Sequence, residues 1–446
     1  MGIEFSIRKF AYPISILKLR RFLEKSQWFS EEELKEYQNK RLKEILEHCY
    51  ENVPYYRNLF HTLKLKPDDF KDTEDLKKLP LLTKDIIRKN FHLLTAKNSK
   101  KFRPFLYKTS GTSGNPLEFY LDKPMHILEF CYYWRHWSWG GYRLGDPFLD
   151  FAFEYFNDRN IEDISYYLPL TRHLIFNSTQ VSFANLDRFV TQIRKHKPLF
   201  LKGLPSTIAT FALLLEKAGY TDISFKAVFT VAEMLLPHHR QIIEKAFHCR
   251  ILDSYSHMES TVAVSQCPHG SYHVNSEYGV FSIEEKEQIS DYGGDKVGEI
   301  IGTSLHNFAM PFLRYKTGDL AVDNSSGEKC PCGRGLPLVK NIVGRTLGVF
   351  ITPDNRFVSG MAIPIDYIEG ILWYQFIQES KKKFIIKITK RDDISQEFIK
   401  ERLTYYYKEI LGEDIDLTIT FVPLDSWDKT SKHSSVVSKL NVGDFI

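Results

Sequence analysis

The sequence predicts an α/β protein with a large N-terminal α/β domain and a small C-terminal α+β domain. In residues 199–255, apolar strand-like runs alternate with helix-like segments, which is typical of a parallel sheet covered by helices. Residues 273–322 change to short strands separated by glycine turns, which predicts a β subdomain. Residues 384–421 read as strand, helix and strand, which predicts a compact unit. With 446 residues the chain is also longer than one simple core supports.

The boundary between the two domains is placed next to the Gly344-Arg345 pair. Residues 1–344 then form the N-terminal domain, and residues 345–446 form the C-terminal domain. The β subdomain is expected over residues 265–340. The chain has no internal repeat and no low-complexity tract, so neither domain is predicted to be a repeat array.

The elements of the N-terminal domain follow from local signals. Helical spacing runs over residues 30–63, where Ser30 with glutamates just behind it forms a plausible capping arrangement. A very aromatic stretch covers residues 130–167. A strand from residue 199 then leads through a glycine turn and an N-cap into an apolar helix that ends near Leu215.

Two further strands complete the parallel part of the sheet. The strand at residues 227–231 leads through Ala232-Glu233 to a helix that begins near Pro237, and another strand follows at residues 250–255. In such a sheet, functional loops lie at the carboxyl ends of the strands, where residues 255–259 fall.

Composition and charge exclude several classes of function. Hydrophobic content of 43% with 26% charged residues is ordinary for a globular protein, and a net charge of +4 is too mild to predict nucleic-acid binding. No apolar run is long enough to cross a bilayer, and no signal peptide opens the chain, so a cytoplasmic location is expected. Residues 3–23 are basic and apolar, but Pro13 interrupts them; we expect a helix packed on the large domain, with membrane contact absent or peripheral. The sequence does not indicate an oligomeric state.

The most informative segment is a loop of hydroxyls and glycines between two strand-like runs. It contains Thr109, Ser110, Gly111, Thr112, Ser113 and Gly114. Glycine backbone and hydroxyl groups can converge on a polyphosphate, although such clusters also form plain turns. The loop is not a Walker A motif, because no Gly-Lys-Ser/Thr follows and residues 117–121 read as a strand. Any lysine for the phosphates must come from elsewhere in the chain.

Three further segments follow this loop in a defined order: residues 253–259 (DSYSHME), residues 314–319 (RYKTGD) and the Gly344-Arg345 pair. Together with the loop they resemble the motifs of the adenylate-forming superfamily of acyl-CoA synthetases. The likeness is strongest to its phenylacetate–CoA ligase-like branch, which includes the CapK-type capsular polysaccharide biosynthesis proteins. Residues 38–57 resemble the opening helix of that branch, and residues 373–378 resemble its C-terminal domain.

The resemblance implies roles for residues of the nucleotide site. Tyr255 would stack on adenine, Glu259 would bind Mg²⁺ and set the phosphates, and Asp319 would accept hydrogen bonds from the ribose hydroxyls. Arg345 would hold the same ribose or the phosphate. The remaining nucleotide contacts are assigned to Glu233, Ser254 and Ser256, together with Ser110, Gly111, Thr112, Ser113 and Gly114 of the loop. The alternatives are a buried tyrosine, a surface glutamate and a turn-forming aspartate.

The catalytic residues implied by the resemblance are Lys432, Glu259 and Thr109. Members of the family carry a Gly-Lys near the C-terminus, whose lysine contacts the carboxylate and the α-phosphate while the acyl-adenylate forms. Here Ser431 replaces that glycine, and Lys429 is a rival to Lys432. The chain departs from the family twice more: Ser256 stands where glycine is usual, and residues 346–348 lack the acidic hinge residue.

The implied function is an AMP-forming ligase that activates a carboxylate with ATP and Mg²⁺ and transfers the acyl group to the thiol of coenzyme A. An alternative acceptor is an amine on a polysaccharide or nucleotide sugar. A nucleotide-binding pseudoenzyme is the non-enzyme alternative. The sequence does not identify the carboxylate.

The six cysteines fall into two groups. Cys49, Cys131 and Cys249 lie in apolar surroundings and are expected to be reduced core residues. The other three lie in polar, glycine-bearing loops and, with one histidine, would complete a structural Zn²⁺ site: Cys267, Cys330, Cys332 and His273, with His269 as the rival ligand. A disulfide is not expected in the cytoplasm. Such a site would fasten the β subdomain to the loop after Glu259 without taking part in catalysis.

Overall fold

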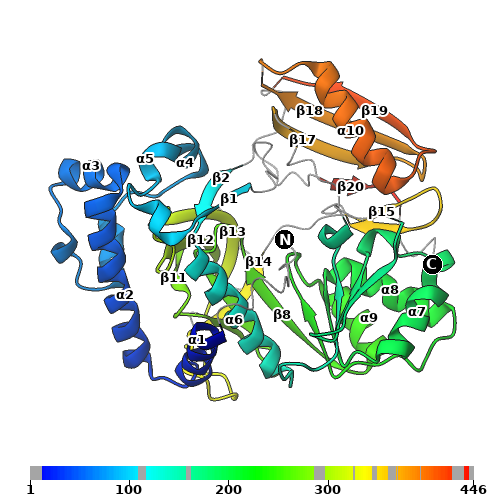
Figure 1. Ribbon diagram of the computed structural model, residues 1–446, viewed down its shortest axis with the longest axis horizontal. Helices are drawn as coiled ribbons and strands as arrows, with labels where there is room; N and C mark the ends of the chain where they lie inside the picture. The colour runs from blue at the N-terminus through cyan, green and yellow to red at the C-terminus, as the bar shows by residue number, and fades with distance from the viewer. Residues whose placement is uncertain are drawn as a thin grey trace.

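The computed structural model describes residues 13–108, 117–156, 162–285, 297–324, 327–343, 349–359, 368, 370–391, 393–423 and 436–440 (Figure 1). Apart from α1, which lies beside the helix of residues 123–139, the N-terminal helices lie at the opposite end of the molecule from the helices between residues 183 and 247 (Figure 1). They are α1 Pro13–Ser26, α2 Glu31–Asn52, α3 Pro54–Leu63, α4 Lys84–Lys89 and α5 Phe91–Leu94, with short 3-10 turns η2 Pro67–Asp69, η3 Thr73–Lys78 and η4 Ser99–Phe102. None of the helices in the described ranges has the length and apolar content of a membrane span.

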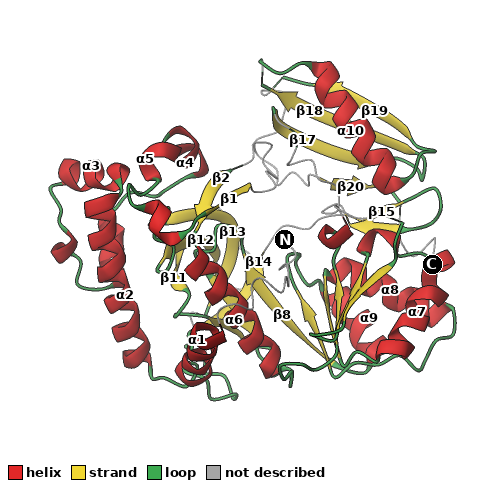
Figure 2. Ribbon diagram, in the orientation of Figure 1, coloured by secondary structure: helices red, strands yellow, loops and turns green. Residues whose placement is uncertain are grey.

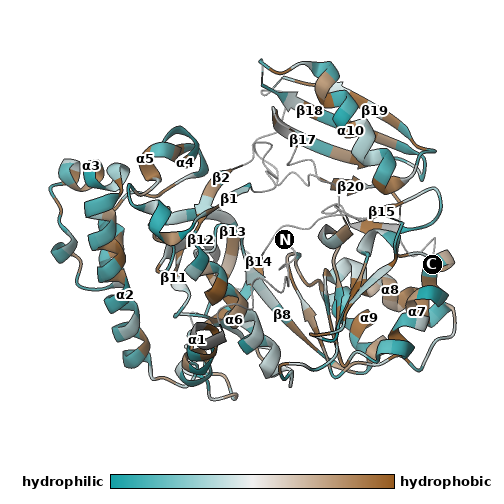
Figure 3. Cartoon of the chain, viewed as in Figure 1, coloured by the Kyte–Doolittle hydropathy of each residue, from teal (hydrophilic) through white to brown (hydrophobic). Residues whose placement is uncertain are grey.

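Helix α2 begins where the capping signal predicts. The Ser30 side chain accepts a hydrogen bond from the Glu33 backbone, and the Glu33 carboxylate accepts one from the Ser30 backbone, so the capping box is complete. Most residues of α2 are hydrophilic, as the teal colour in Figure 3 shows, and only a minority of its residues are buried. Val53 ends α2, and Pro54 begins α3 at a first-turn position, where its missing N–H removes no helical hydrogen bond.

Twelve of the described strands form one sheet, in the order β11-β12-β13-β14-β10-β9-β8-β7-β6-β3-β5-β4 (Figure 2). The parallel part comprises β3 Phe148–Phe151, β5 His173–Phe176, β6 Phe200–Gly203, β7 Ala227–Thr230 and β8 Arg250–Ser256, with β4 Ser165–Leu168 antiparallel at the edge. The antiparallel part comprises β9 Ala263–Gln266, β10 Tyr272–Val274, β11 Gly279–Glu285, β12 Val297–Ser304, β13 Tyr315–Asp323 and β14 Leu338–Val343. The strands expected as a β subdomain therefore continue the main sheet through β8, which pairs with β7 on one side and β9 on the other.

Helices cover both faces of the parallel strands. On one face, α7 Phe183–His196, α8 Pro205–Lys217 and α9 Pro237–Phe247 share a core with β3, β5, β6 and β7. On the other face lies α6 Lys123–Trp139, whose aromatic residues account for much of the aromatic stretch predicted from the sequence. Trp137 of α6 packs against Phe148, with ring centroids 4.7 Å apart. Two short 3-10 turns, η5 Glu154–Phe156 and η6 Ser178–Gln180, join these layers.

The C-terminal domain is a four-stranded sheet in the order β19-β18-β17-β20, with helix α10 across it (Figure 2). Its elements are β17 Ile371–Gln378, β18 Lys383–Lys390, α10 Gln396–Leu411, β19 Asp416–Phe421 and β20 Val436–Ser438. The predicted strand, helix and strand of residues 384–421 are confirmed. Ser395 caps α10 by accepting a hydrogen bond from the backbone of Phe398.

A hairpin of β15 Val349–Ile351 and β16 Phe357–Ser359 joins the two domains. Successive strand residues point to opposite faces, so Phe350 enters the C-terminal core while Ile351 enters the core of the large domain. Arg356, only 6% exposed, donates from Nη1 to the carbonyl of Thr179 in the large domain at 2.8 Å. The same nitrogen donates to the carbonyl of Ile410, near the end of α10, at 2.9 Å.

Candidate active site

The carboxyl end of β8 and the middle of β13 meet at one place, although β9, β10 and β14 separate the two strands in the sheet order. The Tyr255 hydroxyl donates a hydrogen bond to Oδ2 of Asp319 at 3.0 Å. This contact requires the sheet to curve strongly, because flat sheets space strands about 4.8 Å apart. The structure thus brings together the two side chains that the sequence assigned to adenine and ribose.

Asp319 owes its position to a bulge in β13. Opposite β12, the pairing jumps from Ile301–Lys316 to Glu299–Leu320, so three residues of β13 face one residue of β12. Within the bulge Gly318 has φ +86°, a left-handed conformation that glycine adopts without strain. The Asp319 backbone N–H then donates to Oγ1 of Thr317 at 3.1 Å, which fixes the turn of the chain that directs the carboxylate toward Tyr255.

Glu259 is 5% exposed, and both of its carboxylate oxygens have protein partners. The Tyr315 hydroxyl donates to Oε1 at 2.5 Å, and Nδ1 of His257 lies 3.0 Å from Oε2. Burial alone raises the pKa of the Glu259 carboxyl group. The hydrogen bond from His257, the positive charge that this ring can carry, the Lys84 ammonium and the Tyr315 hydroxyl outweigh burial and lower the pKa to about 2. The carboxylate is therefore ionised at neutral pH, as a cation ligand must be.

The other predicted contacts lie on the same edge of the sheet but face different partners. The Ser256 hydroxyl lies 2.8 Å from the Tyr133 hydroxyl of α6, and the Ser254 hydroxyl donates to the carbonyl of Thr230 at 3.2 Å. Glu233, which follows β7, accepts a hydrogen bond from the backbone N–H of Ser206 at 3.2 Å. Because Ser206 is in the first turn of α8, the Glu233 carboxylate stabilises the positive end of that helix.

Several predicted residues lie outside the described residues. They are Thr109, Ser110, Gly111, Thr112, Ser113 and Gly114 of the loop, Arg345, and the two lysines Lys429 and Lys432. The flanks of the loop are described: β1 Phe105–Lys108 and β2 Glu118–Leu121 form an antiparallel hairpin. At the end of the hairpin next to the loop, the Lys108 ammonium pairs with the Glu118 carboxylate at 2.6 Å. The loop therefore begins and ends at adjacent points of a closed hairpin.

The predicted metal ligands converge on one point. One ligand atom from each of Cys267, His273, Cys330 and Cys332 lies within 4.8 Å of the others. The Cys267 and Cys330 sulfurs are 3.5 Å apart, and the Cys332 sulfur is 3.3 Å from Nε2 of His273. His269 does not belong to this group of described residues.

The orientation of His273 suits a metal ligand. Its Nδ1 donates to the carbonyl of Leu336 at 3.3 Å, which leaves Nε2 directed at the thiols. Burial lowers the pKa of His273 to about 4, so the imidazole is neutral at pH 7. Three thiols and one neutral imidazole are a donor set for tetrahedral zinc.

This cluster fastens a loop to the N-terminal helices. The Gly335 backbone N–H donates to the carbonyl of Gln27 at 3.0 Å, and Nε of Arg334 donates to the Gln27 side chain, also at 3.0 Å. The Arg334 guanidinium lies over the Trp139 ring, 4.2 Å from its centroid. The site therefore joins β9, β10, the loop before β14 and the turn between α1 and α2.

No family model matches the sequence. Two curated relatives align over most of their length: protein CapK of Staphylococcus aureus and a phenylacetate-coenzyme A ligase of Thermus thermophilus. The first is 25% identical over 87% of this chain and 86% of its own. The second is 24% identical over 86% of this chain and 84% of its own. The fold matches that of 2-hydroxyisobutyryl-CoA ligase, crystallised in the postadenylation state, with a TM-score of 0.55, 17% identity and coverage of 92% of this chain and 90% of that one.

These relatives support the resemblance to the adenylate-forming superfamily that the sequence motifs indicated. They also support its phenylacetate–CoA ligase-like and CapK branch. The two-domain fold expected from this resemblance is confirmed.

Sequence reasoning missed three residues that contact or influence Glu259: His257, Tyr315 and Lys84. The first two lie inside the quoted motifs, so their positions were visible, but nothing in the sequence pairs them with the glutamate. Lys84 comes from an N-terminal helix. Lys84 lies near Glu259 because the backbone of Leu82, two residues earlier, is hydrogen-bonded at the start of β13. The Leu82 N–H donates to the carbonyl of Arg314, and the Leu82 carbonyl accepts from the N–H of Lys316, both at 2.9 Å.

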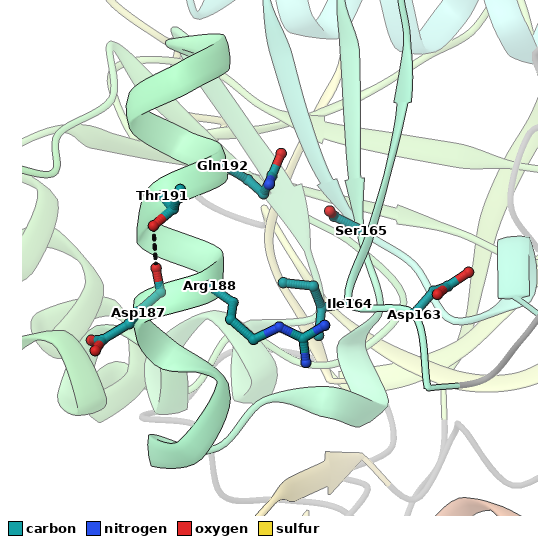
Figure 4. Close-up of a pocket in the computed structure, with 7 residues that line it drawn as sticks. All are labelled: Asp163, Ile164, Ser165, Asp187, Arg188, Thr191 and Gln192. Carbon is teal, nitrogen blue, oxygen red and sulfur yellow. Dashed lines mark hydrogen bonds between the residues drawn. The ribbon is translucent and has the colours of Figure 1, made fainter.

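A separate surface pocket of about 420 Å³ lies between the segment leading into β4 and helix α7 (Figure 4). Its lining residues are Asp163, Ile164, Ser165, Asp187, Arg188, Thr191 and Gln192. None of the predicted nucleotide or metal residues lines it. It is a polar hollow on the helical side of the sheet and plays no part in the site described above.

Proposed function

We propose that this protein is an AMP-forming ligase that activates a carboxylate with ATP and passes the acyl group to the thiol of coenzyme A. The observation that carries the proposal is the convergence of Tyr255, Asp319 and an ionised, buried Glu259 at one edge of the sheet. The fold supports it, since the 2-hydroxyisobutyryl-CoA ligase that shares it has been solved with an acyl-AMP and coenzyme A.

In this proposal the described residues bind the nucleotide through three groups. The Tyr255 ring lies against adenine, and Asp319, already held by the Tyr255 hydroxyl, accepts hydrogen bonds from the ribose hydroxyls. Glu259 would hold Mg²⁺, since an ionised, buried carboxylate with fixed oxygens suits a hard cation. When bound, the cation offsets negative charge on the phosphates. The loop from Thr109 to Gly114 would supply hydroxyl and backbone donors to the phosphate oxygens.

The chemistry takes place in two half-reactions. A carboxylate oxygen of the acid attacks the α-phosphorus of ATP, and the bond to pyrophosphate breaks. Lys432 would contact the carboxylate and the α-phosphate during this step and offset the developing charge. In the second half-reaction the thiol sulfur attacks the acyl carbon, loses its proton, and expels AMP.

A movement of residues 345–446 relative to residues 1–344 would separate the two half-reactions. Lys432, between β19 and β20, belongs to the smaller unit, so a rotation at Gly344-Arg345 would withdraw it and admit the thiol. Arg345 would contact the ribose or phosphate from this boundary.

Zinc is proposed as a structural metal at Cys267, His273, Cys330 and Cys332. Four closed protein ligands leave no coordination position for a substrate, which is the pattern of structural rather than catalytic sites.

The decisive experiment is ATP–pyrophosphate exchange, screened over aryl, fatty, amino and uronic acids. We expect exchange that depends on one class of acid, followed by AMP release on addition of coenzyme A. AMP release with an amine acceptor but not with coenzyme A would assign amide formation instead. Tight ATP binding without exchange for any acid would identify a nucleotide-binding pseudoenzyme.

A further inference from the structure

His257 lies beside the rings of Tyr255 and Tyr315, and one of its ring nitrogens contacts Glu259. Its ring is nearly parallel to that of Tyr255, at a centroid distance of 6.3 Å, and to that of Tyr315, at 5.9 Å. The side chain is 9% exposed, so its position is set by protein contacts rather than by solvent. Both ring nitrogens have partners: Nδ1 faces Glu259, and Nε2 faces Thr261.

The contacts with Thr261 define which nitrogen carries the proton. The backbone N–H of Thr261 points at Nε2 from 3.4 Å, and a backbone N–H can only donate. In the neutral ring Nε2 is therefore the acceptor, and Nδ1 carries the hydrogen that is donated to Oε2 of Glu259 at 3.0 Å.

Thr261 is itself held rigidly. It is fully buried, and its hydroxyl lies 2.9 Å from Nε2 of His257. A Cβ added at Gly302 would fall 1.9 Å from that hydroxyl oxygen, and one added at Gly279 would fall 1.8 Å from the Thr261 carbonyl oxygen. Because these two glycines on neighbouring strands have no Cβ, the strands pack closely against Thr261. This close packing restricts movement of the residue that contacts Nε2 of His257.

The two donors together fix the Glu259 carboxylate. Tyr315 donates to Oε1 and His257 to Oε2, so rotation of the carboxylate about its terminal bond would break both hydrogen bonds. Each oxygen still has a lone pair for a cation, because a carboxylate offers about four acceptor positions in total. Ser260, the next residue, has φ +52°, which turns the chain sharply after Glu259 and directs Thr261 back toward the histidine.

We propose that His257 is a positioning residue for the divalent cation of the nucleotide. His257 is held by its contacts with Thr261, and it holds the Glu259 carboxylate in the orientation that binds the metal accompanying ATP. The inference rests on the proposed function, since it takes Glu259 as the cation ligand. It assigns no proton transfer to His257.

The test compares His257→Leu, which removes the donor, with His257→Asn, whose side-chain N–H can replace Nδ1–H. Binding of Mn²⁺ in the presence of a non-hydrolysable ATP analogue is measured by electron paramagnetic resonance, and binding of metal-free AMP by calorimetry. We expect His257→Leu to weaken Mn²⁺ binding about 10–100-fold, the usual cost of losing a group that orients a metal ligand. AMP affinity should stay within about twofold, and His257→Asn should restore most of the Mn²⁺ affinity.

Equal weakening of Mn²⁺ and AMP binding in His257→Leu would show a general structural role and overturn the proposal. Unchanged Mn²⁺ binding in that variant would overturn it as well. If His257→Leu does not fold, Thr261→Val, which keeps the side-chain volume but removes the hydroxyl, must weaken Mn²⁺ binding selectively.

Glu259→Gln separates this inference from the proposed function. If Glu259→Gln abolishes Mn²⁺ binding and His257→Leu weakens it, but the wild-type protein shows no pyrophosphate exchange, the positioning role stands and the ligase function fails. If Glu259→Gln binds Mn²⁺ like the wild type, Glu259 is not the ligand, and the positioning role fails whatever the exchange assay shows.

Discussion

Replacing Cys330 by serine tests the metal cluster, and the size of the effect follows from the linkage between metal binding and folding. Cys267 and Cys330 are 63 residues apart in sequence, so the ligands of the cluster meet only in the folded chain. Zinc therefore stabilises the folded state by its binding free energy, about 4 kcal/mol when free zinc exceeds its Kd roughly a thousandfold. For a cooperative unit of roughly 340 residues, whose unfolding entropy is large, this corresponds to a fall in Tm of about 6 °C.

The assay combines elemental analysis with thermal unfolding. The wild-type protein should contain one zinc per chain. The Cys330→Ser protein should contain no zinc and should melt about 6 °C lower. Cys249→Ser is a matched control, because Cys249 has intermediate exposure like Cys330 but lies outside the cluster. It should keep the zinc and melt within about 2 °C of the wild type. A wild-type protein without zinc, or a Cys330→Ser protein that keeps both zinc and Tm, would refute the reasoning.

The remaining predictions concern the nucleotide site and one buried acid. Asp319→Ala should raise the Kd for ATP roughly 100-fold, because two charge-assisted hydrogen bonds at about 1.5 kcal/mol or more each are lost; calorimetry showing an unchanged Kd would reject the ribose assignment. Lys432→Ala should slow acyl-adenylate formation about 100-fold while leaving thiolysis of preformed acyl-adenylate near the wild-type rate; equal losses in both steps would point to a structural role and make Lys429 the next variant to test. Burial raises the pKa of Glu129, which lies among tyrosines of α6 and its surroundings, to about 7. Because this folded-state pKa is above the ordinary value of 4.5, the folded protein binds the proton more tightly and loses stability as pH rises from about 4.5 through 7. Glu129→Gln should therefore raise Tm more at pH 8 than at pH 5, and an equal shift at both pH values would contradict the assignment.

The sequence predicted those parts of the molecule that depend on local signals. Ser30 and Glu33 form the expected capping box, because a capping box needs only residues three positions apart. The cysteine and histidine spacing predicted the cluster and favoured His273 over His269. The adjacent strands β6, β7 and β8 were also readable, since each is a short apolar run between turn signals.

The contacts that shape the site could not be predicted, because they depend on how distant strands meet. Tyr315 and Glu259 are 56 residues apart, and their hydrogen bond exists only because the sheet curls back on itself. The alternative considered for Asp319 was a turn-forming aspartate, whereas it lies in a bulge within β13, where a shift in pairing with β12 turns it toward Tyr255. Lys84 lies near Glu259 because Leu82 forms an isolated β-bridge with Tyr315. No periodicity in the sequence predicts this bridge.

The hairpin between the domains has a consequence for the timing of the reaction. The Arg356 guanidinium holds one carbonyl on each side of the junction, Thr179 O and Ile410 O, and Ile351 is buried in the large domain. Hydrogen bonds of this kind are directional, so the smaller domain cannot slide gradually out of this orientation while keeping them. In the proposed movement of residues 345–446, departure would expose Ile351 and release Arg356 from Thr179 together, so the junction would act as a switch with two positions. The strength of this hairpin contact, at a distance from the reacting atoms, would then set how often the protein changes from one half-reaction to the other.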